Sequence, residues 1–245
     1  MSLVDSFEKQ GNFLFKHRGQ LPVLFFFISI PFIFLSSEIN LFFQFIYNII
    51  SVSLTIIGLI IRFYTIGTTP KGTSGRNTNK QIADYLNSSG IYSIVRNPLY
   101  LGNYFIWLGI AFFTYNLCFI FILTLLFWLY YERIIFAEER FLEKKFGSKY
   151  LNWSSETPVF IPSFKRFKKS SLSFSFKSIL RREYAGMLAT VVGFSFVEIV
   201  RTYFLTNSLN MSPTIFKILI FVSIVVFILR YIKHNTNILD ETDRS

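Results

Sequence analysis

The stretch LYLGNYFIWLGIAFFTYNLCFIFILTLLFWLYYERIIF, residues 99–136, decides how this chain can fold. It holds two apolar segments, 99–115 and 117–136, separated by a turn that contains no lysine or arginine. An α-helix rises about 1.5 Å per residue and the hydrocarbon core of a bilayer is about 30 Å thick, so segments of about this length can cross it. Because the turn is so short, the sequence predicts an antiparallel pair of membrane helices whose outer ends meet at one membrane surface.

Four more apolar segments lie on either side of this hairpin, at residues 21–36, 41–61, 184–205 and 215–232. The segments 21–36 and 99–115 are short for a complete span. With 52% hydrophobic and 20% aromatic residues among 245, the chain carries more apolar surface than one soluble core could bury. The sequence therefore predicts an all-α, multi-pass integral membrane protein with about six transmembrane helices.

Lysine and arginine occur in every second loop. The N-terminal segment and residues 62–98, 133–182 and 230–233 are basic, whereas the turns 37–40 and 206–213 hold neither residue. Because basic loops stay in the cytoplasm, both termini and both long loops are predicted to be cytoplasmic, in the inner membrane of a bacterium. The net charge of +11 flanks apolar stretches, which favours contact with an anionic phospholipid surface and argues against a nucleic-acid partner.

Three parts are expected along the chain: membrane helices in 1–64, the hairpin with its loop and polar helix end in 65–164, and a basic segment with two membrane helices in 165–245. Within the second part, a short helix is predicted at 80–86. The helix that begins at 117 should continue out of the membrane as it turns charged. One cysteine, Cys118, and two histidines in opposite terminal segments predict no metal site.

Polar residues gather at both outer ends of the hairpin. Arg96, Asn97 and Pro98 precede its first helix, where proline suits the first turn and free N–H groups attract anions. Glu138 and Glu139 lie just beyond the second apolar segment, at the polar end of the same helix. Carboxylates could take the ammonium of a zwitterionic amino acid, and arginine or N–H groups its carboxylate. Taken singly, adjacent glutamates at a helix end are usually a solvated face and Arg-Asn-Pro is usually a turn, and the residues alone leave both interpretations open.

The ordered combination resembles the isoprenylcysteine carboxyl methyltransferase and phospholipid methyltransferase superfamily over residues 90–162. It consists of Arg96-Asn97-Pro98-Leu99-Tyr100-Leu101-Gly102, then Glu138-Glu139, Leu142, Phe146-Gly147, Tyr150 and the proline-bounded stretch 158–162. The resemblance implies S-adenosylmethionine bound at the cytoplasmic end of the hairpin and methylation of a membrane lipid or lipidated substrate. It also implies the residues of the cofactor site, which would be Arg96, Pro98, Tyr100, Gly102, Glu138 and Glu139.

One departure bears on the acceptor, because Asn97 stands where that superfamily usually has histidine. If the histidine serves as a base, its absence favours an acceptor that is already ionised. A prenylcysteine carboxylate or a lipid phosphate such as that of lipid A would then be methylated on oxygen, with a phosphatidylethanolamine amine as the alternative. Arg133, near headgroup depth, is predicted with Asn97 to act on the acceptor. A non-enzymatic transport or assembly protein is the rival class, supported by Glu198 and Arg201 inside an apolar segment.

Overall fold

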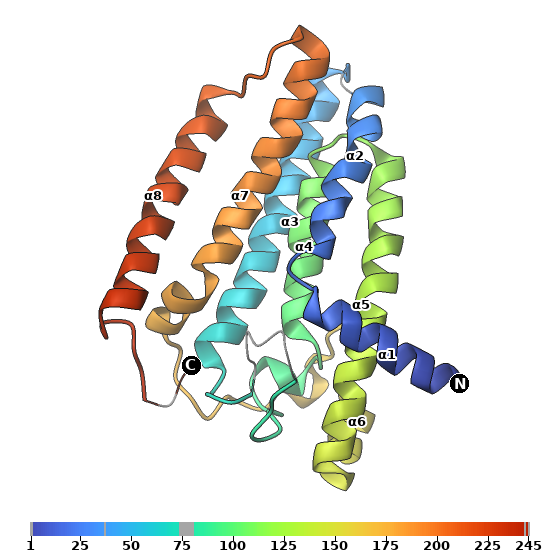
Figure 1. The fold of residues 1–245 in the computed structure, drawn as a ribbon, viewed down its shortest axis with the longest axis vertical. Coiled ribbons are helices and arrows are strands. Elements are labelled where there is room, and N and C mark those ends of the chain that lie inside the picture. The colour runs from blue at the N-terminus through green and yellow to red at the C-terminus, as the bar shows by residue number, and fades with distance from the viewer. Residues whose placement is uncertain (1, 37, 74–80, 243, 245) are drawn as a thin grey trace.

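Six apolar helices form the bundle in the computed structural model, which describes residues 2–36, 38–73, 81–242 and 244 (Figure 1). They are α2 (Leu24–Leu35), α3 (Leu41–Thr68), α4 (Pro98–Phe112), α5 (Leu117–Phe146), α7 (Phe176–Thr206) and α8 (Pro213–Asn235). Among the described residues, α3, α5, α7 and α8 are long and apolar enough to cross a membrane, whereas α2 and α4 are shorter apolar helices. The predicted all-α membrane class is confirmed, and the six predicted spans correspond to four long helices and these two.

The hairpin of α4 and α5 begins and ends as its sequence requires. Pro98 occupies the first turn of α4, and the Asn116 side chain caps α5 by accepting a hydrogen bond from the Phe119 N–H at 3.0 Å. The same Asn116 amide donates to the Ser36 hydroxyl at 2.7 Å, which ties the turn to the end of α2. As predicted, α5 continues beyond the apolar segment, and it ends where Gly147 adopts a φ of +51°.

Helix α4 lies directly against α3 because small residues face each other. A Cβ atom on Gly102 would lie 2.6 Å from Cγ of Arg62 and 2.9 Å from the Gly58 carbonyl oxygen. Further along the same contact, the Ser51 hydroxyl donates to the Gly109 carbonyl at 2.6 Å. The close approach lets these polar groups form hydrogen bonds within the protein, in a part of the helices where lipid tails would offer no hydrogen-bond partner.

One local prediction is wrong, and one helix is present that is not predicted. Residues 81–86 are not helical, since the Asp84 N–H donates to the Gly72 carbonyl at 2.7 Å and the chain there is irregular; Lys80 lies outside the described residues. The basic N-terminal segment, for which no separate helix is predicted, forms the helix α1 (Leu3–Lys16). Its start is a capping box in which Ser2 and Asp5 each accept a hydrogen bond from the other's backbone N–H.

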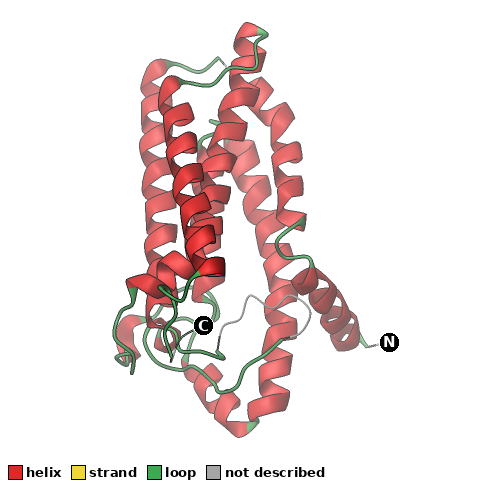
Figure 2. Ribbon diagram, turned by 60° about the vertical axis from the view of Figure 1, so that its left-hand side comes forward, coloured by secondary structure: helices red, strands yellow, loops and turns green. Residues whose placement is uncertain are grey.

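The long connections and both chain ends gather at one end of the bundle, and the short turns lie at the other (Figures 1 and 2). Helix α1 projects sideways there across α5, and the short helix α6 (Ser148–Glu156) follows α5. Helix α7 packs against α2, α3 and α4, while α8 packs on α7 and has no buried residue. The arrangement follows the predicted alternation of loops, and the cytoplasmic orientation of the loop end stays a prediction.

Candidate functional site

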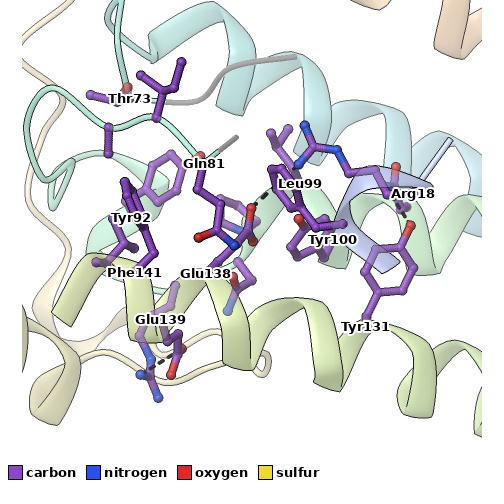
Figure 3. Close-up of a pocket in the computed structure, with 18 of the residues that line it drawn as sticks. Arg18, Thr73, Gln81, Tyr92, Leu99, Tyr100, Tyr131, Glu138, Glu139 and Phe141 are labelled. Atoms are coloured by element: carbon purple, nitrogen blue, oxygen red, sulfur yellow. Dashed lines mark hydrogen bonds and ion pairs between the residues drawn. The ribbon is translucent and has the colours of Figure 1, made fainter. Parts of the chain in front are cut away.

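A cavity of about 330 Å³ lies at the loop end of the bundle, with walls from α1, α3, α4, α5, α6 and α7 (Figure 3). Six of the eight predicted site residues line it: Arg96, Asn97, Pro98, Tyr100, Glu138 and Glu139. The hairpin explains this convergence, because the start of α4 and the polar end of α5 meet at the same level. Arginines, carboxylates and aromatic rings therefore line one partly open cavity.

Arg96 and Glu139 form the ion pair of the motif, with 2.9 Å between Nη1 of the arginine and Oε1 of the glutamate. The backbone of Arg96 is held by its N–H, which donates to the Pro158 carbonyl at 2.9 Å. Nη1 also donates weakly to the Tyr150 hydroxyl at 3.5 Å. Burial, reinforced by the charge of Glu139, raises the pKa of Tyr150, so this hydroxyl stays protonated at neutral pH.

The adjacent glutamates face different arginines. The Oε1 atom of Glu138 is 3.7 Å from Nη1 of Arg18, and the Tyr100 hydroxyl faces the same carboxylate (Figure 3). Consecutive residues on a helix point about 100° apart, which is why Glu138 and Glu139 reach different arginines. Both carboxylates still line the same cavity.

Asn97 fastens a loop to the start of α4. Its side-chain Nδ2 donates to the Val159 carbonyl at 3.1 Å, and it makes no capping hydrogen bond to the helix that follows. The next turn of the same loop is held by Ser163, whose N–H donates to the Ile94 carbonyl at 2.9 Å. The side-chain amide of Asn97 therefore holds the loop at Val159 against the start of α4, at the edge of the cavity.

Gly102 and Arg133 do not line the cavity. Gly102 instead serves the close contact of α4 with α3 described above. The Arg133 guanidinium lies 3.5 Å from the centroid of the Phe7 ring in α1 and pairs with Glu132 at 2.9 Å. Arg133 lies about one and a half turns before Glu138 on α5, as predicted. Five residues rotate a helix by about 140° beyond one full turn, however, so the Arg133 side chain leaves a different face of α5 from that of Glu138.

Several lining residues are absent from the predicted set, and two charged ones among them join α3 to α7. Arg62 donates to both carboxylate oxygens of Glu183, at 2.7 and 2.8 Å, with side-chain exposures of 17% and 3%. Its third contact is the amide oxygen of Asn103, whose own Nδ2 donates to the Tyr131 hydroxyl at 3.4 Å. An ionisable residue inside an apolar segment is a sequence signal for such a pair, but the partner across the bundle is not.

The pair formed by Glu198 and Arg201 has a structural role. Arg201 donates to the Phe113 carbonyl at the end of α4, and its guanidinium lies 3.8 Å from the centroid of the Tyr115 ring. Glu198 lies 3.4 Å from the same guanidinium. The pair therefore supports the turn of the hairpin, at the end of the bundle opposite the cavity.

The part of the chain that contains the hairpin matches a known protein family. Residues 46–149 match the family model of phospholipid methyltransferases, which confirms the predicted resemblance for this part of the chain. Over 98 residues the chain is 34% identical to the cobalt-zinc-cadmium resistance protein CzcN of Cupriavidus metallidurans, covering 40% of this chain and 43% of that protein. No solved structure matches the chain. The matched segment contains all six predicted cofactor residues, but neither α1 nor α7.

Proposed function

We propose that this membrane protein is an S-adenosylmethionine-dependent methyltransferase that acts on a membrane lipid or a lipidated acceptor. The observation that carries the proposal is the cavity at the end of the family-matching hairpin, where Glu138 and Glu139 face two different arginines. A site built in this way offers opposite charges to both ends of an amino-acid group.

The lining fits the cofactor in three respects. Carboxylates suit its ammonium, guanidinium groups its carboxylate, and the aromatic side chains of Tyr92, Tyr150 and Trp153 offer surfaces for a purine. In addition, the buried Nε of Arg96 has no hydrogen-bond partner among the described residues, so the site holds a donor to spare. When bound, S-adenosylmethionine supplies a methyl group on a positively charged sulfur.

An oxyanion is the acceptor class we favour, as in a prenylcysteine carboxylate or a lipid phosphate. Such an oxygen is ionised near neutral pH and needs no base, and the carboxamide of Asn97 provides none, since it does not take up a proton in this pH range. The described lining residues include the arginines Arg18, Arg62, Arg96 and Arg182 against three glutamates, an excess of one positive charge that favours an anionic headgroup. Methylation of a phosphatidylethanolamine amine is the alternative.

Cofactor binding tests the proposal directly. Purified protein in lipid nanodiscs should bind labelled S-adenosylmethionine, and the folded double variant Glu138→Gln/Glu139→Gln should bind it more weakly by about 1.5 to 3 kcal/mol for each charge-assisted hydrogen bond lost. Glu143→Gln is the matched control, because Glu143 lies on the same helix, pairs with Arg140 and does not line the cavity. Unchanged affinity in the double variant would contradict the proposed site.

The acceptor can be identified in cells. Membranes from cells grown on methionine with a deuterated methyl group, with and without the protein, should differ by a lipid that carries the heavy methyl. Fragmentation by mass spectrometry then separates an ester oxygen from an amine nitrogen. A heavy methyl found on nitrogen would refute the oxyanion acceptor and leave the methyltransferase intact.

A further inference from the structure

Helix α1 brings a cation into the candidate site from outside the family-matching segment. Arg18 follows α1 directly, lines the cavity beside Glu138 and stacks on the ring of Phe15 with 4.0 Å to the centroid (Figure 3). The side chains of Arg18 and Glu138 are 20% and 26% exposed. The pair is thus partly shielded from water, where a charge–charge contact counts for more than on an open surface.

The position of Arg18 is set by the docking of α1 on α5. Gly11 packs against the α5 backbone at Arg133, and a Cβ atom on it would lie only 2.7 Å from Cβ of Ala137. An ion pair between Glu8 and Lys144 at 2.6 Å holds the helix on one side of this contact. On the other side, Phe15 is buried in the cluster around Tyr131 and Ile134. Arg18 is therefore presented to the cavity by a firmly packed element.

The two glutamates differ in how tightly they are held. Glu139 is 2.9 Å from Arg96, whereas Glu138 is 3.7 Å from Arg18 and forms the looser pair. An incoming ammonium can therefore join Glu138 at the lower cost. The ammonium would then lie beside the like charge of Arg18 in a partly buried place, and an anion supplied by the same ligand would offset that repulsion.

We propose that Arg18 binds the carboxylate of the cofactor's amino-acid group while Glu138 binds its ammonium. Each charge then has a partner before and after binding, because Arg18 exchanges one carboxylate for another. This inference rests on the proposed function, and it makes α1 part of the cofactor site. Helix α1 thereby selects ligands that carry a free amino acid.

Two related probes isolate this contact. S-adenosylhomocysteine carries the amino acid, and 5′-methylthioadenosine has the same nucleoside and a thioether without it. Arg18→Leu should weaken binding of the first probe about 10- to 100-fold and leave the second within about 2-fold, as expected for loss of one charge-assisted contact. Arg18→Lys should restore part of the loss, because it keeps the charge but not the two-pronged geometry.

Two further variants separate binding from folding and from net charge. Lys9→Leu removes the same charge from an exposed position of α1 and should leave both affinities unchanged. Gly11→Leu keeps Arg18 but should lift α1 from α5, and should reproduce the selective loss. Binding is measured by equilibrium dialysis on the full chain in nanodiscs.

The outcomes are distinct. An equal loss of both probes in Arg18→Leu, or no loss of either, overturns the inference and leaves the proposed function in place. Failure of wild-type protein to bind S-adenosylhomocysteine overturns both.

Discussion

The buried pair of Arg62 and Glu183 predicts a large and specific loss of stability. Glu183→Leu would leave the Arg62 guanidinium, only 17% exposed, without the carboxylate that now accepts two of its hydrogen bonds. Removing one partner of a buried ion pair costs about 3 to 5 kcal/mol, because the remaining charge is desolvated and uncompensated. Arg62→Met should cost a similar amount by stranding Glu183, which is 3% exposed.

Removing both charges should be much cheaper than either single change suggests. When apolar residues of similar size replace a buried pair, the result is close to neutral, so Arg62→Met/Glu183→Leu should recover most of the loss. The double-mutant cycle should then give an interaction energy of about 3 kcal/mol or more. The pair Arg140 and Glu143, exposed by 35% and 36%, is the matched control, and its cycle should give only about 0.3 to 0.5 kcal/mol.

Reversible unfolding in mixed micelles, followed by far-ultraviolet circular dichroism, measures these free energies. The cycle tests whether α7, which lies outside the family-matching segment, is fastened to α3 through this contact. A cost below about 1 kcal/mol for Glu183→Leu would refute the reasoning, as would a double variant no more stable than the weaker single one.

Three other predictions follow from single contacts. Gly102→Ala should destabilise the protein by about 1 to 3 kcal/mol in the same unfolding assay, since its Cβ would lie 2.9 Å from a backbone oxygen of α3, whereas Gly186→Ala meets only a side-chain oxygen at 3.6 Å and should not. A cysteine at Ser171 should react with an impermeant thiol reagent from the cytoplasmic side and one at Ser208 from the opposite side; labelling from the same side would contradict the predicted topology. Burial raises the pKa of Glu241, but hydrogen bonds from two serine hydroxyls and a nearby arginine outweigh it and lower the pKa. The ionised carboxylate should therefore hold residues 236–242 in place above the ordinary carboxyl pKa. This docking should weaken as the pH falls through the lowered pKa. Hydrogen-exchange protection factors should show this acid dependence in the wild type and not in Glu241→Gln.

Local chemistry made much of this protein predictable from its sequence. The lengths of the apolar segments predict the helices, since a helix in lipid satisfies its own backbone hydrogen bonds. The short turn before Leu117 predicts the hairpin, and with it the meeting of Arg96 with Glu138 and Glu139. The helices and the turn depend on neighbours a few residues apart, and the hairpin that they form then brings the two distant motifs together.

The tertiary structure decided which faces of the helices meet. Arg133 has the right height on α5 and the wrong rotation, and only the docking of α1 shows that it faces Phe7. Arg18 and Glu183 enter the cavity because α1 and α7 pack where they do, across sequence separations that carry no local signal. Residues 81–86 are irregular because a backbone bond to Gly72 replaces the helical pattern that their composition favours. The rotation of each helix and its docking on its neighbours depend on many side-chain contacts between segments that are distant in the sequence. The hydrophobic periodicity of one segment gives no information about those contacts.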